Sequence, residues 1–102
     1  IMPLAEQGAS PSWFGFPITL VETGYRTEMQ RYLSDQGVDT RLIFAGNLTK
    51  QPYMKGRAYR VAGSLENSDK VMNDSLWIGL HPALSEEQLN YACDKIETFL
   101  SV

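Results

Sequence analysis

The stretch that decides the fold is Ser75–Leu100, SLWIGLHPALSEEQLNYACDKIETFL. Apolar side chains alternate along its first part, which predicts a strand over Ser75–Leu80. Ser85 with Gln88 three residues later matches a capping box and predicts the start of a helix. The helix carries an apolar stripe at helical spacing, formed by Leu89, Ala92, Cys93, Ile96, Phe99 and Leu100. The stretch therefore predicts a strand followed by a helix that packs on a sheet.

Two elements are predicted nearer the N-terminus. The run Trp13–Val21, WFGFPITLV, is aromatic and β-branched and predicts a strand. Pro17 has no N–H to donate, so this strand is expected at a sheet edge or a bulge. A helix follows, with Thr27 and Gln30 as its expected capping box and Gly37 as its end.

The remaining pattern completes a small domain. Thr40–Ala45 reads as a second strand and about Asn67–Asp74 as a short helix, whereas Ile1–Ser12 shows no periodicity and reads as a linker. We therefore expect one α/β domain over residues 13–102, an α+β two-layer sandwich in the order β-α-β-loop-α-β-α. Its three-stranded, largely antiparallel sheet would be covered on one face by about three helices.

The charge is distributed unevenly. The 102 residues carry a formal net charge of −3, yet Arg41–Arg60 contains five basic residues and no acidic one. The rest of the chain holds four basic and twelve acidic residues. A cationic stretch on an acidic body favours a local anion site over general adhesion to nucleic acid.

Most of that cationic stretch lies in a long segment without regular pattern, Gly46–Gly63. Loops longer than about 12–15 residues are uncommon in compact domains unless they bind something or are disordered. Tyr53 and Tyr59 argue against plain disorder, which makes the segment the best candidate for function. A solvated loop that balances the acidic body remains an equal alternative on composition alone.

The sequence gives little support for a metal site, a catalytic residue or a membrane span. A metal site needs several His, Cys or carboxylate ligands at suitable spacing, and the chain has one His and one Cys. His81 reads as a turn residue and Cys93 as a small core residue, so no catalytic or metal-ligating residue is expected in this chain. No apolar run approaches the ~20 residues of a membrane span. A single cysteine points to a reducing, cytoplasmic location.

Three strings carry a resemblance to a known family: SWFGFPITL (Ser12–Leu20), GVDTRLIFAGNLTKQPYMKG (Gly37–Gly56) and YRVAGSLENSDKVMNDSLWIGLHPALSEEQL (Tyr59–Leu89). They resemble the C-terminal domain of DegT-type sugar-nucleotide enzymes, which have the fold-type-I aminotransferase architecture. Within that group, TRLIFAGNLTKQP looks most like 3-dehydrases acting on CDP-4-keto-6-deoxy-D-glucose in lipopolysaccharide O-antigen biosynthesis.

The resemblance implies a longer, dimeric enzyme with pyridoxamine phosphate (PMP), a [2Fe-2S] cluster and an electron-donating reductase partner. Cofactor, cluster and catalytic base would lie mostly in a large domain that is not part of this chain, which would be inactive alone. The matching positions expected to contact a CDP-linked 4-keto-6-deoxy sugar or the cofactor are Arg41, Asn47, Gln51, Tyr53, Lys55 and Arg57.

Two alternatives stay open. A pyridoxal phosphate (PLP)-dependent keto-sugar aminotransferase of the same family would carry a lysine upstream where a dehydrase has histidine. A free-standing module that captures an anionic partner with its basic loop is the reading from another class of protein.

Overall fold

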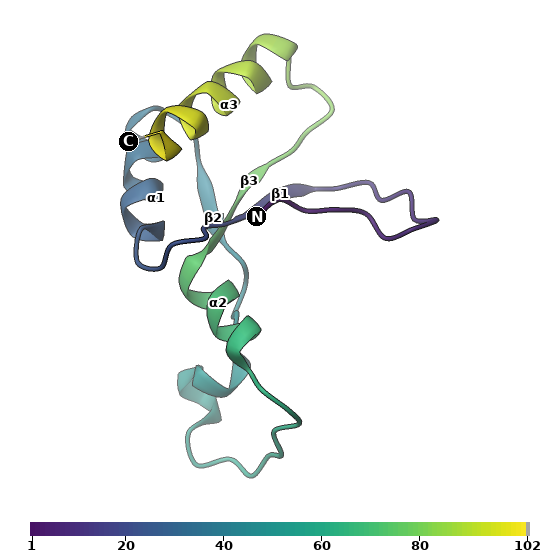
Figure 1. The fold of residues 1–102 in the computed structure, drawn as a ribbon, viewed down its shortest axis with the longest axis vertical. Coiled ribbons are helices and arrows are strands. Elements are labelled where there is room, and N and C mark those ends of the chain that lie inside the picture. The colour runs from purple at the N-terminus through teal and green to yellow at the C-terminus, as the bar shows by residue number, and fades with distance from the viewer. Residues whose placement is uncertain (102) are drawn as a thin grey trace.

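The computed structural model describes residues 1–101 and contains, within them, three strands and three α-helices (Figure 1). Two single turns of 3-10 helix, η1 and η2, interrupt the long connection between the second strand and the second helix. The order is β1 (Gly15–Thr19), α1 (Arg26–Asp35), β2 (Thr40–Leu42), η1 (Leu48–Lys50), η2 (Pro52–Met54), α2 (Glu66–Asp74), β3 (Ser75–Gly79) and α3 (Glu86–Leu100). The predicted element order is confirmed.

The sheet is antiparallel throughout, in the strand order β1-β3-β2. β1 is therefore an outer strand, which confirms the edge position predicted from Pro17. Ile18 and Leu76 are opposite each other in the register and point to the face that α1 and α3 cover (Figure 1). Trp77, one residue further along β3, lies on the opposite face. We call that opposite side the outer face.

The core lies between the inner face of the sheet and the two helices α1 and α3. Met29, Leu33 and Leu76 have no exposed surface, and they are joined by three further buried side chains, Ile18, Leu20 and Ile96. Full burial of such a side chain stabilises the fold by about 1.5–3 kcal/mol relative to its exposure to water. The structure therefore gains most of its apolar stabilisation at this one layer.

The ends of α1 show one correct and one wrong prediction. Gly37 has φ 75°, and its N–H donates to Ser34 while Val38 donates to Leu33, the Schellman arrangement expected of a glycine stop. At the other end, Thr27 is not the N-cap. The helix begins at Arg26, and no side chain caps it.

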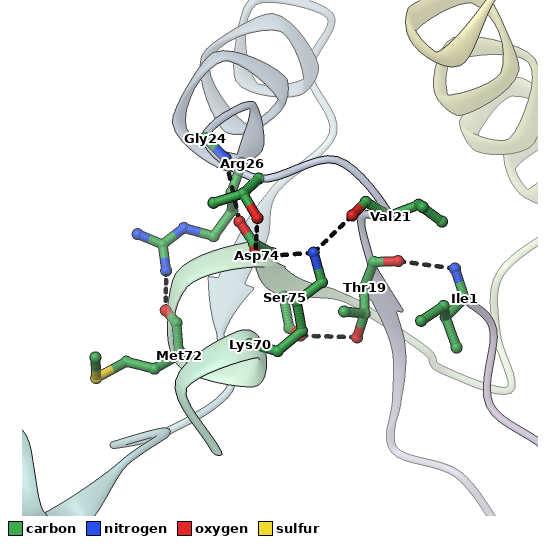
Figure 2. Close-up of polar contacts among 10 residues, drawn as sticks. Ile1, Thr19, Val21, Gly24, Arg26, Lys70, Met72, Asp74 and Ser75 are labelled. Atoms are coloured by element: carbon green, nitrogen blue, oxygen red, sulfur yellow. Dashed lines mark hydrogen bonds and ion pairs between the residues drawn. The ribbon is translucent and has the colours of Figure 1, made fainter. Parts of the chain in front are cut away.

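The start of α1 is fixed instead by Asp74, at the junction of α2 and β3 (Figure 2). One Asp74 carboxylate oxygen accepts from the Gly24 N–H and the other from the Thr23 hydroxyl, both at 3.2 Å. Lys70 forms an ion pair with the same carboxylate at 3.0 Å and also donates to the Val21 carbonyl. Asp74 thus ties the connection between β1 and α1 to α2.

Asp74 is 1% exposed, and its burial alone would raise the pKa of the carboxyl group. The hydrogen bonds from Lys70, Gly24 and Thr23 outweigh that effect, so the pKa is lowered overall. The buried carboxylate is therefore held in its charged form by its partners.

The last helix begins as predicted but is covered less than predicted. Ser85 and Gln88 form both hydrogen bonds of the capping box. Of the predicted stripe, however, only Ile96 is fully buried, and Cys93 is exposed rather than a core residue. The reason is that the first turns of α3 extend beyond the sheet (Figure 1). Among residues 1–101, no helix combines the length and apolarity needed to cross a bilayer.

Candidate functional site: an exposed basic segment beside an aromatic sheet face

The basic segment, residues 41–60, begins on β2 and leaves the sheet earlier than the sequence predicts. β2 ends at Leu42 rather than Ala45 because Phe44 takes φ 41°, a left-handed conformation incompatible with a continuing strand. Gly46 follows with φ 59°, and a Cβ atom there would lie 2.4 Å from the Cβ of Met72. A glycine is therefore required where the segment passes against α2.

Four polar side chains, which we call the polar clamp, hold the segment on α2: Asn47, Thr49, Lys50 and Asp69. Asn47 is 3% exposed, and its amide donates to the Asp69 carboxylate at 2.7 Å. Its carbonyl oxygen accepts from the backbone N–H and the hydroxyl of Thr49. Lys50 forms an ion pair with Asp69 at 2.8 Å. The hydrogen bonds from Lys50 and Asn47 lower the pKa of Asp69.

Beyond the clamp, the segment folds on itself through η1 and η2. Gln51 donates from its amide to the Ala45 carbonyl at 2.7 Å. Arg57 donates from Nε to the Tyr53 carbonyl at 2.8 Å, which leaves the rest of its guanidinium group for other ligands. The segment that lacks a sequence period is thus built from short turns and local hydrogen bonds.

Apart from Lys50, which pairs with Asp69, the cations of the segment point into solvent. Arg41, Lys55 and Arg57 are exposed, and Tyr53 between them is 56% exposed. Within residues 1–101, neither the guanidinium group of Arg41 nor the ammonium group of Lys55 has a hydrogen-bond or ion-pair partner. Figure 1 shows the segment projecting past α2, away from α1 and α3. Its charge is therefore available to an external anion.

A group of aromatic rings lies beside Arg41 on the outer face, and the sequence analysis did not identify it. Phe14 packs edge-on against Trp77 with ring centroids 4.8 Å apart, and Phe44 lies 6.0 Å from the same ring on the other side. Arg41 is the direct cross-strand neighbour of Trp77. Trp77 covers Gly15 so closely that a Cβ atom there would lie 1.6 Å from the ring.

We call Phe14, Phe44 and Trp77 the aromatic cluster. Phe14 and Phe44 are 68% and 80% exposed. The signal for the cluster was present in the alternation of β3, which places Trp77 opposite to Leu76 and Ile78. Gly15, which permits close backbone approach on β1, was the second signal.

The six sequence-predicted positions thus separate into three places. Arg41 lies on the sheet beside the aromatic cluster, while Tyr53, Lys55 and Arg57 lie on the projecting part of the segment. Asn47 and Gln51 point inward and hold the segment in shape. The arrangement presents cations and aromatic surface, which suits anionic and ring-bearing ligands.

The residues present do not suit an iron–sulfur cluster. Such clusters are held mainly by cysteine thiolates, and Cys93 is the single cysteine of the chain. Residues 1–101 contain no group of three His, Cys, Asp or Glu side chains placed to hold a metal ion. A phosphate-bearing cofactor fits better, because free guanidinium and ammonium groups are the side chains that bind phosphate.

The fold and the exposed cations define an α/β domain with a surface suited to anionic ligands. Residues 1–97 match the DegT/DnrJ/EryC1/StrS aminotransferase family. The chain is 47% identical to the lipopolysaccharide biosynthesis protein RfbH of Salmonella typhimurium over 99% of its length, and 34% identical to a dTDP-4-dehydro-2,6-dideoxy-D-glucose 3-dehydratase of Saccharopolyspora spinosa over 99%. The chain belongs to this family.

The chain spans about a quarter of its relatives, 24% of the RfbH protein and 22% of the dehydratase. Two solved structures have the same fold. A DegT/DnrJ/EryC1/StrS aminotransferase from Brucella abortus superposes with a TM-score of 0.80 at 24% identity, over 96% of this chain and 25% of the other. A GDP-4-keto-6-deoxymannose-3-dehydratase with a trapped PLP-glutamate geminal diamine gives 0.76 at 22%, over 92% and 25%.

Proposed function

We propose that this chain is the C-terminal small domain of a PMP-dependent CDP-4-keto-6-deoxy-D-glucose 3-dehydrase of lipopolysaccharide biosynthesis. The support is the 47% identity to a lipopolysaccharide biosynthesis protein over almost the whole chain, and the 34% identity to a sugar 3-dehydratase. The reaction removes the C3 hydroxyl group of the nucleotide-linked sugar. The large domain of the same enzyme would supply the catalytic base.

The proposal rests on one observation: some polar residues of the basic segment point inward and hold its backbone, whereas others point into solvent. Its inward-pointing residues, among them Asn47 and Gln51, use their polar groups to hold the backbone. Arg41 and Lys55 keep their charges free in solvent. Such free cations can bind the diphosphate of a nucleotide sugar or the phosphate of the cofactor, and because the backbone that carries them is already held, only their side chains need to be ordered. Tyr53 offers a ring for a sugar or base.

Cofactor and partners follow from this proposal. Bound PMP would offer an amine for the ketone of the sugar, and this chain would contribute the positive charge of Arg41 and Lys55 and help exclude water. The [2Fe-2S] cluster would be bound outside this chain and receive electrons from a reductase. We place the parent enzyme, a homodimer, in the cytoplasm.

The test is a product assay on the full-length enzyme. Purified enzyme with PMP, CDP-4-keto-6-deoxy-D-glucose, a reductase and a reduced nicotinamide cofactor as its electron source should yield a CDP-linked sugar lacking the C3 oxygen, identified by mass spectrometry. The dTDP- and GDP-linked sugars serve as matched substrates and should react more slowly. Faster reaction of either would reject the CDP assignment.

An aminotransferase is the second candidate, favoured by the family that the chain matches. It predicts that glutamate and PLP convert the ketone to an amine with retention of the C3 oxygen, in the same assay. A lysine upstream, in place of the dehydrase histidine, would accompany this result. The free-standing module predicts instead micromolar binding of a CDP-sugar by the 102-residue chain alone.

A further inference from the structure

A groove of about 600 Å³ lies between α1, α3 and the start of the chain. Its walls are mainly apolar and include Leu20, Val21, Tyr25, Tyr32 and Phe99. Val21 and Tyr25 are 76% and 49% exposed. Water-exposed apolar walls of this kind mark a surface that another segment covers.

The first residue of the chain lies at this groove and pairs with the open edge of β1 (Figure 2). The Ile1 nitrogen donates to the Thr19 carbonyl at 2.7 Å, and the Thr19 N–H donates to the Ile1 carbonyl at 3.1 Å. Two residues that exchange both backbone hydrogen bonds form an antiparallel pair. A peptide N–H at Ile1 would make the same bond as the amine.

This pairing fixes a direction. In an antiparallel pair, residues that precede Ile1 run beside residues that follow Thr19. A residue one position upstream of Ile1 would lie opposite Leu20, and a residue two positions upstream opposite Val21. Leu20 donates its N–H to Asp74, whereas the Val21 N–H has no partner within residues 1–101. The Val21 carbonyl already accepts from Lys70, so it is the Val21 N–H that remains open at this edge.

We propose that the segment immediately upstream of Ile1 in the full-length protein extends the sheet along Leu20 and Val21 and covers this groove. The inference rests on the proposal that the chain is a domain of a longer enzyme, which its coverage of a quarter of its relatives supports. It makes this groove the surface on which the rest of the polypeptide is anchored.

The groove also sets the chemistry of its occupant. The apolar walls require apolar side chains at every second residue of an extended upstream segment. Glu22 and Glu28 line the same groove and are exposed, so a basic side chain further upstream would complement them. The occupant is thus an apolar segment of this same polypeptide with a basic group at its far end.

The experiment is a disulfide cross-link in the full-length protein. Val21→Cys is combined with a cysteine two positions upstream of Ile1, in a Cys93→Ser background. Hydrogen-bonded antiparallel partners have Cα atoms about 5.5 Å apart, within the range of a disulfide. The matched control replaces Val21→Cys by Val61→Cys, another exposed valine, which directly follows the basic segment.

We expect peptide mapping after mild oxidation to find the Val21 pair within one chain, at least about tenfold more abundant than the Val61 pair. Equal yields, or a bond between two chains, would overturn the inference. Hydrogen exchange of the unmodified protein is a second measurement that needs no variant. The Val21 amide should exchange at least about tenfold more slowly than the Val61 amide, and equal rates would contradict the pairing. Dehydrase activity enters neither readout, so failure of the proposed function is detected separately.

Discussion

Two regions of the molecule are held together by different forces. One is the layer formed by the sheet with α1 and α3, and the other is the projecting basic segment. In the first, six buried apolar side chains pack together, and three of them have no exposed surface. In the second, none of the residues of η1 and η2 is buried. The segment is held by directional bonds from Asn47, Lys50 and Gln51.

We therefore expect the core to determine the stability of the domain, and the basic segment to determine how its cations are presented to a ligand. Apolar packing is lost cooperatively, so damage to the core is felt throughout the domain. Polar bonds at an exposed segment contribute little each, but they determine where its cations stand. Substitutions in the two regions should therefore be distinguishable by what they change.

The largest effect is expected in the core. Leu33→Ala should lower the free energy of unfolding of the 102-residue chain by about 2–5 kcal/mol, because the buried site cannot collapse fully around the smaller side chain. Leu48→Ala, at a residue that is 55% exposed in the basic segment, is the control and should change it by less than about 0.5 kcal/mol. Urea unfolding measures both. Similar losses would show that the segment is packed into the core.

A smaller effect is expected at Asp74, which joins α2 to the connection between β1 and α1. Asp74→Ala leaves the Gly24 N–H, the Thr23 hydroxyl and Lys70 without their acceptor and should cost about 1–3 kcal/mol. The pKa of Asp74 is lowered in the folded state, so its contribution is present above about pH 4, where the unfolded chain is also ionised.

That contribution should be lost as the pH falls through the lower folded pKa of Asp74. The wild-type chain should therefore lose more stability between about pH 5 and about pH 2 than Asp74→Asn, whose side chain does not titrate. Urea unfolding across this range gives the comparison. Parallel pH profiles would mean that the folded pKa of Asp74 is not lowered.

An effect of about 1 kcal/mol is expected from Ser85→Ala, which removes the hydrogen bond to the Gln88 N–H at the start of α3. The loss should appear in the thermal midpoint of the chain. Ser101→Ala, at an exposed serine beyond the end of the same helix, is the control and should change the midpoint less. A midpoint unchanged by Ser85→Ala would show that the first turn of α3 is frayed.

Asp69→Asn should cause the smallest change in global stability, but a large local change in how firmly the basic segment is held. It removes the ion pair with Lys50, and at an exposed site such a pair contributes little to global stability. Trypsin should nevertheless cut after Lys55 and Arg57 several-fold faster, because the polar clamp no longer holds the segment. Cleavage at the wild-type rate would mean that Asn47 alone suffices.

Features that depend only on residues close together in the sequence were predictable. The Ser85–Gln88 capping box and the Gly37 helix stop depend on neighbours within a few residues, and both have the predicted geometry. Thr27 failed as a cap because Asp74, fifty positions from Gly24, fixes the start of α1. Cys93 failed as a core residue because spacing predicts a face, and α3 extends past the sheet that would cover that face.

The candidate site shows the same limit. The absence of acidic residues from 41–60 is sufficient to predict the cationic segment from the sequence. The sequence could not show that Asn47 points inward to Asp69 while Lys55 points outward, because both are polar residues in a segment without periodicity. That distinction depends on the contact with α2, which is made by residues about twenty positions away.

The most direct test of the central claim, that the cations of the basic segment bind the anionic substrate, compares two arginines in the full-length enzyme. Arg41→Ala removes a cation from the candidate site, and Arg31→Ala removes an exposed one from α1. Losing a charged hydrogen bond to phosphate costs about 1.5–3 kcal/mol, so kcat/KM for the nucleotide sugar should fall about ten- to a hundredfold for Arg41→Ala alone. Wild-type kcat/KM in Arg41→Ala, or an equal fall in Arg31→Ala, would contradict the account.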